Sequence, residues 1–134
     1  MFFFSLLAAA EIPAAWVGSW YSETKEDKQY AGKNYDIRRE LLVNRADGTK
    51  TNTFRYYAGT QMIAESTATY AWGVDNGVYW TVCRTVIRNN QAAACSTRAE
   101  YEVLSSTARE MRYRSRASGT TYSILRVNDN FKLP

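Results

Sequence analysis

Ala15-Trp16-Val17-Gly18-Ser19-Trp20-Tyr21-Ser22-Glu23 is the stretch of sequence on which the fold prediction depends. A glycine lets the backbone pack closely, and the tryptophan that follows at Trp20 is large enough to fill the floor of a small barrel. We therefore predict that 16–23 forms the first strand of a barrel. Such a barrel also needs a cation on its last strand, which would lie against the indole of Trp20.

The composition favours strands and limits the chemistry. The chain has 134 residues, which fits one domain, and it contains ten Tyr but only two Pro. The net charge of +4 permits contact with acidic partners without requiring nucleic acid, and we expect no nucleic-acid binding. The chain has no His, so the usual hydrolytic triads and most zinc sites are excluded. We therefore expect neither an enzyme nor a bound metal or other cofactor.

The first ten residues form an uncharged apolar run that ends in Ala8-Ala9-Ala10. This pattern is typical of the later part of a secretion signal, and the alternative is a buried N-terminal segment. The run is too short to cross a bilayer, so we expect no membrane span. We predict a signal-peptide remnant over 1–10, a barrel domain over 11–134, and a secreted or periplasmic location.

The two cysteines, Cys83 and Cys95, are spaced symmetrically about Asn89. A hairpin that turns at 88–91 brings them close together, so a cross-strand disulfide is geometrically reasonable. A disulfide agrees with export, whereas two buried free thiols would be the alternative in a cytosolic protein.

Turn signals recur at short intervals along the chain, as in an all-β barrel or sandwich. Asp47-Gly48 and Asp75-Asn76-Gly77 are the strongest of them. Between the turns we predict eight strands, at 16–23, 37–44, 50–57, 66–74, 78–87, 95–104, 109–116 and 121–127. The expected fold is all-β, a single eight-stranded antiparallel up-and-down barrel, which leaves no exposed sheet edge.

Two hairpins predict which side chains face the core. A turn at Asp47-Gly48 places Leu41 opposite Phe54, Arg39 opposite Tyr56 and Val43 opposite Asn52. The predicted core face of this pair is then mostly apolar, with Ile37, Leu41, Val43, Phe54 and Tyr56.

A last turn through Ser118-Gly119 places Met111 opposite Arg126, Tyr113 opposite Ile124 and Ser115 opposite Tyr122. These residues form the predicted inward face. The other face of the hairpin, with Arg112, Arg114 and Arg116, is predicted to face solvent.

With these motifs in place, the chain resembles the lipocalin-like (calycin-type) family of small secreted bacterial barrels. The matching residues are Gly18-Ser19-Trp20-Tyr21, Asn44-Arg45-Ala46-Asp47-Gly48-Thr49, Trp72-Gly73 and 119–126. In that family the opening tryptophan stacks on a basic residue from the closing part of the barrel. The resemblance therefore implies a structural contact between Trp20 and Arg126, beside Gly18.

The predicted function is binding of a small, largely apolar ligand inside the barrel by a monomeric protein. Tyrosine suits such a site because its ring contacts an apolar ligand and its hydroxyl fixes a polar group. An eight-stranded barrel can also be filled by its own side chains, and the sequence leaves both outcomes open. The candidate ligand-binding residues are the predicted interior aromatics Phe54, Tyr56, Trp72, Tyr79, Tyr113 and Tyr122.

The alternative is a protein-binding module, either an inhibitor or an immunity protein. Ala117-Ser118-Gly119-Thr120-Thr121-Tyr122 resembles the loop with which periplasmic C-type lysozyme inhibitors enter the lysozyme cleft. The predicted outer arginine stripe would add a basic face for an acidic protein partner.

Overall fold

The computed structural model describes residues 11–134; the predicted signal-peptide remnant, 1–10, lies outside the described residues. A short 3-10 helix, η1 (Ala14–Trp16), precedes the first strand. The strands that follow are β1 (Gly18–Tyr30), β2 (Lys33–Asn44), β3 (Thr49–Ala58), β4 (Gln61–Asp75), β5 (Val78–Arg88), β6 (Gln91–Ala94), β7 (Arg98–Ser106), β8 (Glu110–Ser115) and β9 (Thr121–Val127).

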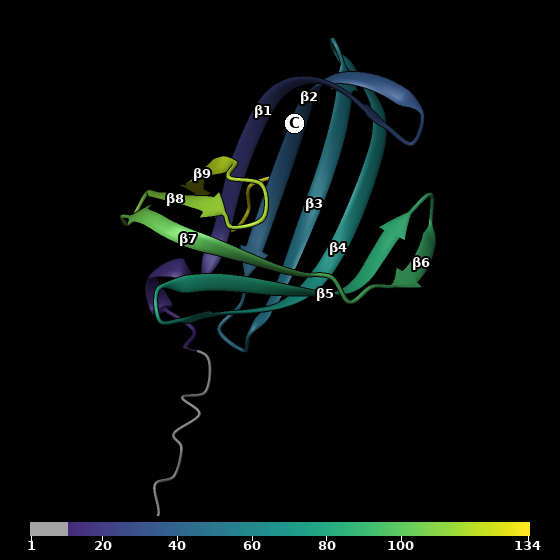
Figure 1. Ribbon diagram of the computed structural model, residues 1–134. Coiled ribbons are helices and arrows are strands. Elements are labelled where there is room, and N and C mark those ends of the chain that lie inside the picture. The colour runs from purple at the N-terminus through teal and green to yellow at the C-terminus, as the bar shows by residue number, and fades with distance from the viewer. Residues whose placement is uncertain (1–10) are drawn as a thin grey trace, which may run out of the picture.

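Eight of the described strands close into an antiparallel barrel, which confirms the predicted fold class. The order of neighbours runs β4-β3-β2-β1-β9-β8-β7-β5, and pairing of β4 with β5 closes the ring. The long strands β1 to β4 form one tall wall, with β5 and β7 running in front of it in Figure 1. Apart from β6, strands adjacent in sequence are adjacent in the sheet, as in an up-and-down barrel.

The short strand β6 is an addition that the sequence analysis did not predict. It pairs with the C-terminal part of β5, residues 85–88, through a two-residue turn at Asn89 and Asn90, both of which have positive φ. The chain then crosses over, and the next strand, β7, pairs with the N-terminal part of β5, residues 78–82. The predicted strand 95–104 therefore begins at Arg98. The predicted disulfide between Cys83 and Cys95 is confirmed, with Cα atoms 5.3 Å apart, and it fastens this crossover to β5.

One end of the barrel is closed by large buried side chains. Trp20 has no exposed surface, and its indole Nε1 donates to the carbonyl of Trp16 at 3.0 Å. The guanidinium carbon of Arg126 lies 4.2 Å from the centre of the Trp20 ring. The rest of this floor is Leu42, Trp72, Tyr79, Met111, Tyr113 and Ile124, which pack with Trp16. Burial of this many large aromatic and aliphatic groups is the main source of the barrel's stability.

Gly18 is required by the same contact. Its φ is +127°, and a Cβ atom there would lie 2.6 Å from Nη1 of Arg126. Nη1 also donates to the carbonyl of Val17 at 3.0 Å, and Nε donates to the carbonyl of Ala108 at 2.8 Å. The guanidinium therefore joins the ends of β1 and β9 over the indole, in space that only glycine leaves free.

The predicted register of β2 and β3 is wrong by one residue. Leu41 lies opposite Thr53 where Phe54 was predicted. In the same way, Arg39 lies opposite Arg55 and not Tyr56, and Val43 lies opposite Thr51 and not Asn52. The turn has one residue more than predicted, because Gly48 adopts a φ of +85° and its N–H donates to the carbonyl of Arg45.

This slip changes which β2 residues face the interior, since a shift by one residue turns every side chain to the other face. Phe54 and Tyr56 do point inward, but they share that face with Arg38, Glu40 and Leu42. The apolar residues Ile37, Leu41 and Val43 lie instead on the outer face. The interior of this wall is consequently more polar than predicted.

The last hairpin is shifted by two residues, which preserves the predicted faces. Met111 lies opposite Ile124, not Arg126, and Tyr113 lies opposite Tyr122, not Ile124. Ser115 therefore does not face Tyr122 as predicted; on its other side, in the β7–β8 pair, it lies opposite Tyr101. The loop is longer than predicted, with the N–H of Ser115 donating to the carbonyl of Thr120. Met111, Tyr113 and Ile124 are buried and Arg112, Arg114 and Arg116 are exposed, as predicted.

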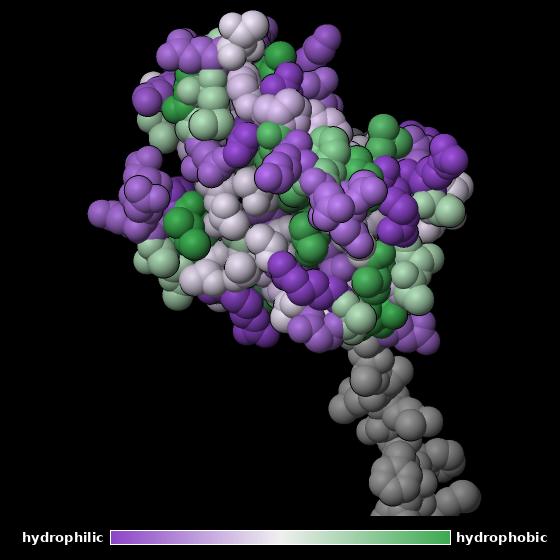
Figure 2. Space-filling view, turned by 180° about the vertical axis from the view of Figure 1, so that it is seen from behind, coloured by the Kyte–Doolittle hydropathy of each residue, from purple (hydrophilic) through white to green (hydrophobic). Residues whose placement is uncertain are grey.

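The C-terminal residues cover part of the outer wall. Phe131 packs on Tyr21 with ring centres 5.1 Å apart, and Leu133 is buried. The carbonyl of Leu133 accepts from Arg55 at 2.8 Å, and that of Pro134 accepts from the Tyr57 hydroxyl. Elsewhere the surface is mixed, and Figure 2 shows hydrophobic residues in separate groups among hydrophilic ones. Within residues 11–134, no helix has the length and hydrophobicity to cross a membrane.

Candidate functional site: a tyrosine-lined cavity

A cavity of about 410 Å³ occupies the barrel directly above the closed end. Leu42 and Tyr79 belong both to the packed floor and to the cavity lining, so the floor of the barrel is also the bottom of the cavity. Arg88 and Thr97 line the cavity and are exposed, which places its mouth at the end opposite Trp20. The volume lies within the usual range for small-molecule sites.

Most of the aromatic residues that the sequence analysis selected meet at this cavity. Phe54, Tyr56, Tyr79, Tyr113 and Tyr122 all line it. Trp72 does not: its indole is buried in the floor, stacked on Trp16 with ring centres 6.4 Å apart. Its Nε1 donates to the carbonyl of Thr49 at 3.1 Å, so it holds the β2–β3 turn against the barrel.

Four tyrosines from β5, β7, β8 and β9 form a continuous aromatic wall. Tyr79 and Tyr113 meet edge to face at 5.3 Å, and Tyr101 and Tyr113 do so at 5.1 Å. Tyr122 stacks on Tyr113 at 5.6 Å. Edge-to-face and offset pairs are the favoured arrangements of aromatic rings, so the rings of this wall pack on one another without a ligand.

Several hydroxyls in the cavity have no protein partner. Tyr70, Tyr101 and Tyr122 line the cavity and are partly buried. Their hydroxyls make no hydrogen bond to any other residue of 11–134. Burial raises the pKa of Tyr70 and of Tyr101 to about 12, so both phenols stay protonated at neutral pH. They can donate to, or accept from, a molecule in the cavity.

Two opposite charges that were not predicted from the sequence lie at the inner end of the cavity. Lys50 of β3 is 2% exposed, and its Nζ donates to the hydroxyl of Tyr79. Glu40 of β2 also lines the cavity, and its Oε2 accepts from Nδ2 of Asn52 at 3.1 Å. A correct register would have found the pair, because Glu40 then shares the inward face with Lys50 and Asn52.

Burial shifts both charged groups toward their neutral forms. It lowers the pKa of Lys50 to about 8, although the charge of Glu40 opposes the shift. It raises the pKa of Glu40, against the charges of Lys50 and Arg38 and the hydrogen bond from Asn52. Perturbed acid and base groups that share one cavity are a frequent mark of a functional site.

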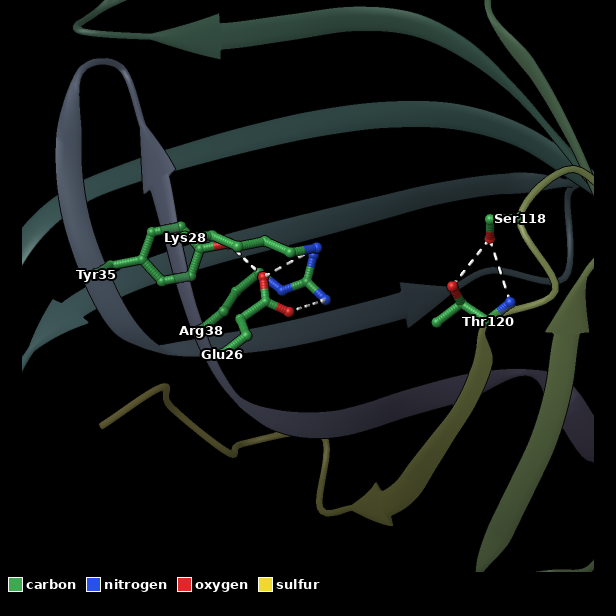
Figure 3. A network of polar contacts seen from close by, with 6 residues as sticks. All are labelled: Glu26, Lys28, Tyr35, Arg38, Ser118 and Thr120. Atoms are coloured by element: carbon green, nitrogen blue, oxygen red, sulfur yellow. Dashed lines mark hydrogen bonds and ion pairs between the residues drawn. The ribbon is translucent and has the colours of Figure 1, made fainter.

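The rim of the cavity carries a second polar group. Tyr30 stacks on Tyr56 with ring centres 4.0 Å apart, and Arg38, the cross-strand partner of Tyr56, also lines the cavity. Figure 3 shows the Glu26 carboxylate between Arg38, Lys28 and the Tyr35 hydroxyl. Arg38 lies 3.8 Å from Glu26, so its position is set by the long β1–β2 hairpin beside the mouth.

The outer arginine stripe is largely neutralised by the neighbouring strand. Arg114 lies 2.7 Å from Glu102, and Arg116 lies 3.3 Å from Glu100. Ion pairs at such exposed positions contribute little stability, but they reduce the positive charge of this face. Only Arg112 of the stripe has no ion-pair partner among the described residues.

The loop 116–120 is held by its own hydrogen bonds. The Ser118 hydroxyl accepts from the N–H of Thr120 at 3.2 Å and donates to Thr120 Oγ1 at 3.0 Å. Figure 3 shows this contact apart from the Glu26 group. The loop that resembles the lysozyme-inhibitor motif is therefore an ordered turn, with its serine already hydrogen-bonded.

No cluster of three or more metal-ligating side chains occurs within residues 11–134. The fold defines the class of protein: a small closed antiparallel barrel with an internal cavity, compatible with a calycin-like fold. The sequence matches no protein-family model, and no curated protein or solved structure shows significant similarity to it.

Proposed function

We propose that this protein binds a small molecule, with a mainly apolar body, inside the barrel. The observation that carries the proposal is the cavity of about 410 Å³, which seven tyrosines and Phe54 help to line and which is floored by a packed tryptophan cluster. Small-molecule sites are typically concave, mostly apolar and supplied with a few polar groups that orient the ligand. The unpartnered tyrosine hydroxyls and the Glu40–Lys50 pair supply such groups here.

Secretion or a periplasmic location is part of the same proposal. The disulfide at the crossover supports it, because disulfides persist mainly in oxidising compartments. Both cysteines line the cavity near its mouth, so the cross-link also holds the wall of the site. Binding, not catalysis, is the proposed activity, and a monomer is the proposed state.

The experiment is a titration with N-phenylnaphthylamine, a neutral probe that becomes fluorescent in an apolar site. Ala68 of β4 is buried and lines the cavity, so Ala68→Trp places an indole in the ligand space. Thr67, its neighbour on β4, does not line the cavity, so Thr67→Trp is the matched control. Both variants are first checked for native secondary structure by circular dichroism.

We expect saturable binding of one probe per chain in the wild type and in Thr67→Trp, and loss of that binding in Ala68→Trp. Equal binding by all three proteins would mean that the probe lies outside the barrel, and the proposal would be wrong. A lysozyme inhibition assay on the same preparation tests the protein-binding alternative. Inhibition that Ser118→Arg abolishes would favour that alternative.

A further inference from the structure

The two charged groups at the inner end of the cavity face the same space without pairing directly. Lys50 donates to Tyr79, Glu40 accepts from Asn52, and no ion pair within 4.0 Å joins Glu40 and Lys50 in the described part of the chain. Glu40 is only partly buried by surface area although it lies inside the barrel wall. Its accessible surface therefore opens into the cavity.

This arrangement suits a polar group that both donates and accepts a hydrogen bond. An ammonium group can only donate, and an ionised carboxylate can only accept. A ligand carboxylate would be attracted by Lys50 but repelled by Glu40, and a ligand ammonium would meet the reverse conflict. A neutral hydroxyl can accept from Lys50 and donate to Glu40, and it adds no further charge to a site that already holds Lys50, Glu40 and Arg38.

The surroundings of the pair favour a ring that carries this hydroxyl. Tyr79 accepts from Lys50 and is also the first ring of the aromatic wall, with Tyr101 stacked on it at 5.3 Å. A planar aromatic body placed against these rings would bring its substituent to the floor, next to Lys50. Aromatic contacts of this kind add stabilisation beyond the area that they bury.

We propose that the ligand is a phenol, whose hydroxyl lies between Glu40 and Lys50. The hydroxyl donates its hydrogen to the Glu40 carboxylate, and its oxygen accepts from Nζ of Lys50. The amide of Asn52 holds the carboxylate in position from the other side. This inference rests on the proposed function, because it names the chemical class that the same cavity selects.

The test compares three probes of similar size by calorimetric titration, below the pKa of the phenol. Para-nitrophenol donates and accepts, para-nitroanisole only accepts, and para-nitrobenzoate is an anion. We expect para-nitrophenol to bind about tenfold or more tightly than either of the others, because each of them leaves one buried group without a partner.

Two variants assign the preference to the pair. Glu40→Gln keeps the shape of the side chain but can direct its amide N–H groups at the ligand, and Lys50→Met removes the cation. Each is expected to reduce the preference for para-nitrophenol to about threefold or less. Arg112→Met, on the outer face, is the control and is expected to retain the full preference.

Each other outcome overturns the inference in a recognisable way. Equal affinities for the three probes would show that the hydroxyl is not recognised, while the cavity still binds small aromatics. Tightest binding of para-nitrobenzoate would show an anion site at Lys50. If no nitro probe binds but N-phenylnaphthylamine does, the inference fails alone; if that probe also fails to bind, the proposed function fails with it.

Discussion

Replacing Lys50 tests how strongly the barrel penalises a buried ammonium. Lys50 is 2% exposed, and burial lowers its pKa from 10.5 to about 8. Each unit of pKa shift corresponds to about 1.4 kcal/mol, so keeping Lys50 protonated in the folded state costs about 3 kcal/mol relative to the unfolded chain. We predict that this cost makes the stability of the wild type depend on pH.

The direction follows from the sign of the shift. The folded pKa lies below the unfolded value, so the contribution of Lys50 is fully present above about pH 10.5 and is lost as the pH falls through about 8. In Lys50→Met this dependence is absent. Glu40 changes the difference between the two proteins in the same direction. Its pKa is raised by burial, so the fold loses stability as Glu40 ionises with rising pH, and in Lys50→Met the charge of Lys50 no longer opposes that loss.

The assay is urea denaturation of both proteins at pH 7 and pH 9. The free energy of unfolding of the wild type, relative to Lys50→Met, should rise by at least about 1 kcal/mol between these values. Lys25→Met, which removes an exposed lysine of β1, is the control and is denatured at the same two pH values. If the difference between the wild type and Lys50→Met is the same at both pH values, Lys50 is not buried as an ammonium.

The remaining predictions concern the closure of the barrel and its cross-link. Gly18→Ala should lower the free energy of unfolding by about 2 kcal/mol in urea denaturation, because φ is +127° and the new Cβ meets Arg126; an unchanged stability would contradict the close contact. Arg126→Leu should lower the free energy of unfolding by about 3 kcal/mol, whereas the exposed control Arg112→Leu should change it by no more than about 0.5 kcal/mol. Equal effects of the two substitutions would argue against the contact between Arg126 and the indole. Reduction of Cys83–Cys95, with a sequence separation of 12, should cost about 3 kcal/mol when denaturation is repeated with a thiol reductant, and no change would mean that the bond does not stabilise the fold.

The closure of the barrel could be predicted from the sequence because it depends on which face a residue occupies. The last hairpin is shifted by two residues from its predicted register, and a shift of two leaves each side chain on the same face. Met111, Tyr113 and Ile124 were therefore placed inside correctly. The disulfide was predictable for a similar reason, since its spacing about Asn89 matches a short turn.

The polar interior could not be predicted because two local signals agreed on the wrong register. Asp47-Gly48 is typical of a two-residue turn, but Gly48 takes a left-handed conformation at the end of a longer loop. The apolar residues Leu41 and Val43 also favoured that register. The C-terminal residues partly cover the outer wall, so apolar side chains on that wall are not evidence of a core face.

Trp72 is a second residue whose position was only partly predictable from the sequence. Its inward direction was predicted, but its height along the barrel was not, and height decides whether a side chain lines the cavity or fills the floor. The structure places it against Trp16, below the cavity. Position along the axis depends on the stagger of all the strands, which no single hairpin determines.

If the barrel interior is open, it should accept a small aromatic molecule above the tryptophan floor. The most direct measurement is the anomalous difference map from a crystal of this protein soaked with para-bromophenol. We expect one bromine peak inside the barrel, with the ring against Tyr79, Tyr101 and Tyr113. Bromine only on the outer surface, or a barrel filled by its own side chains, would contradict it.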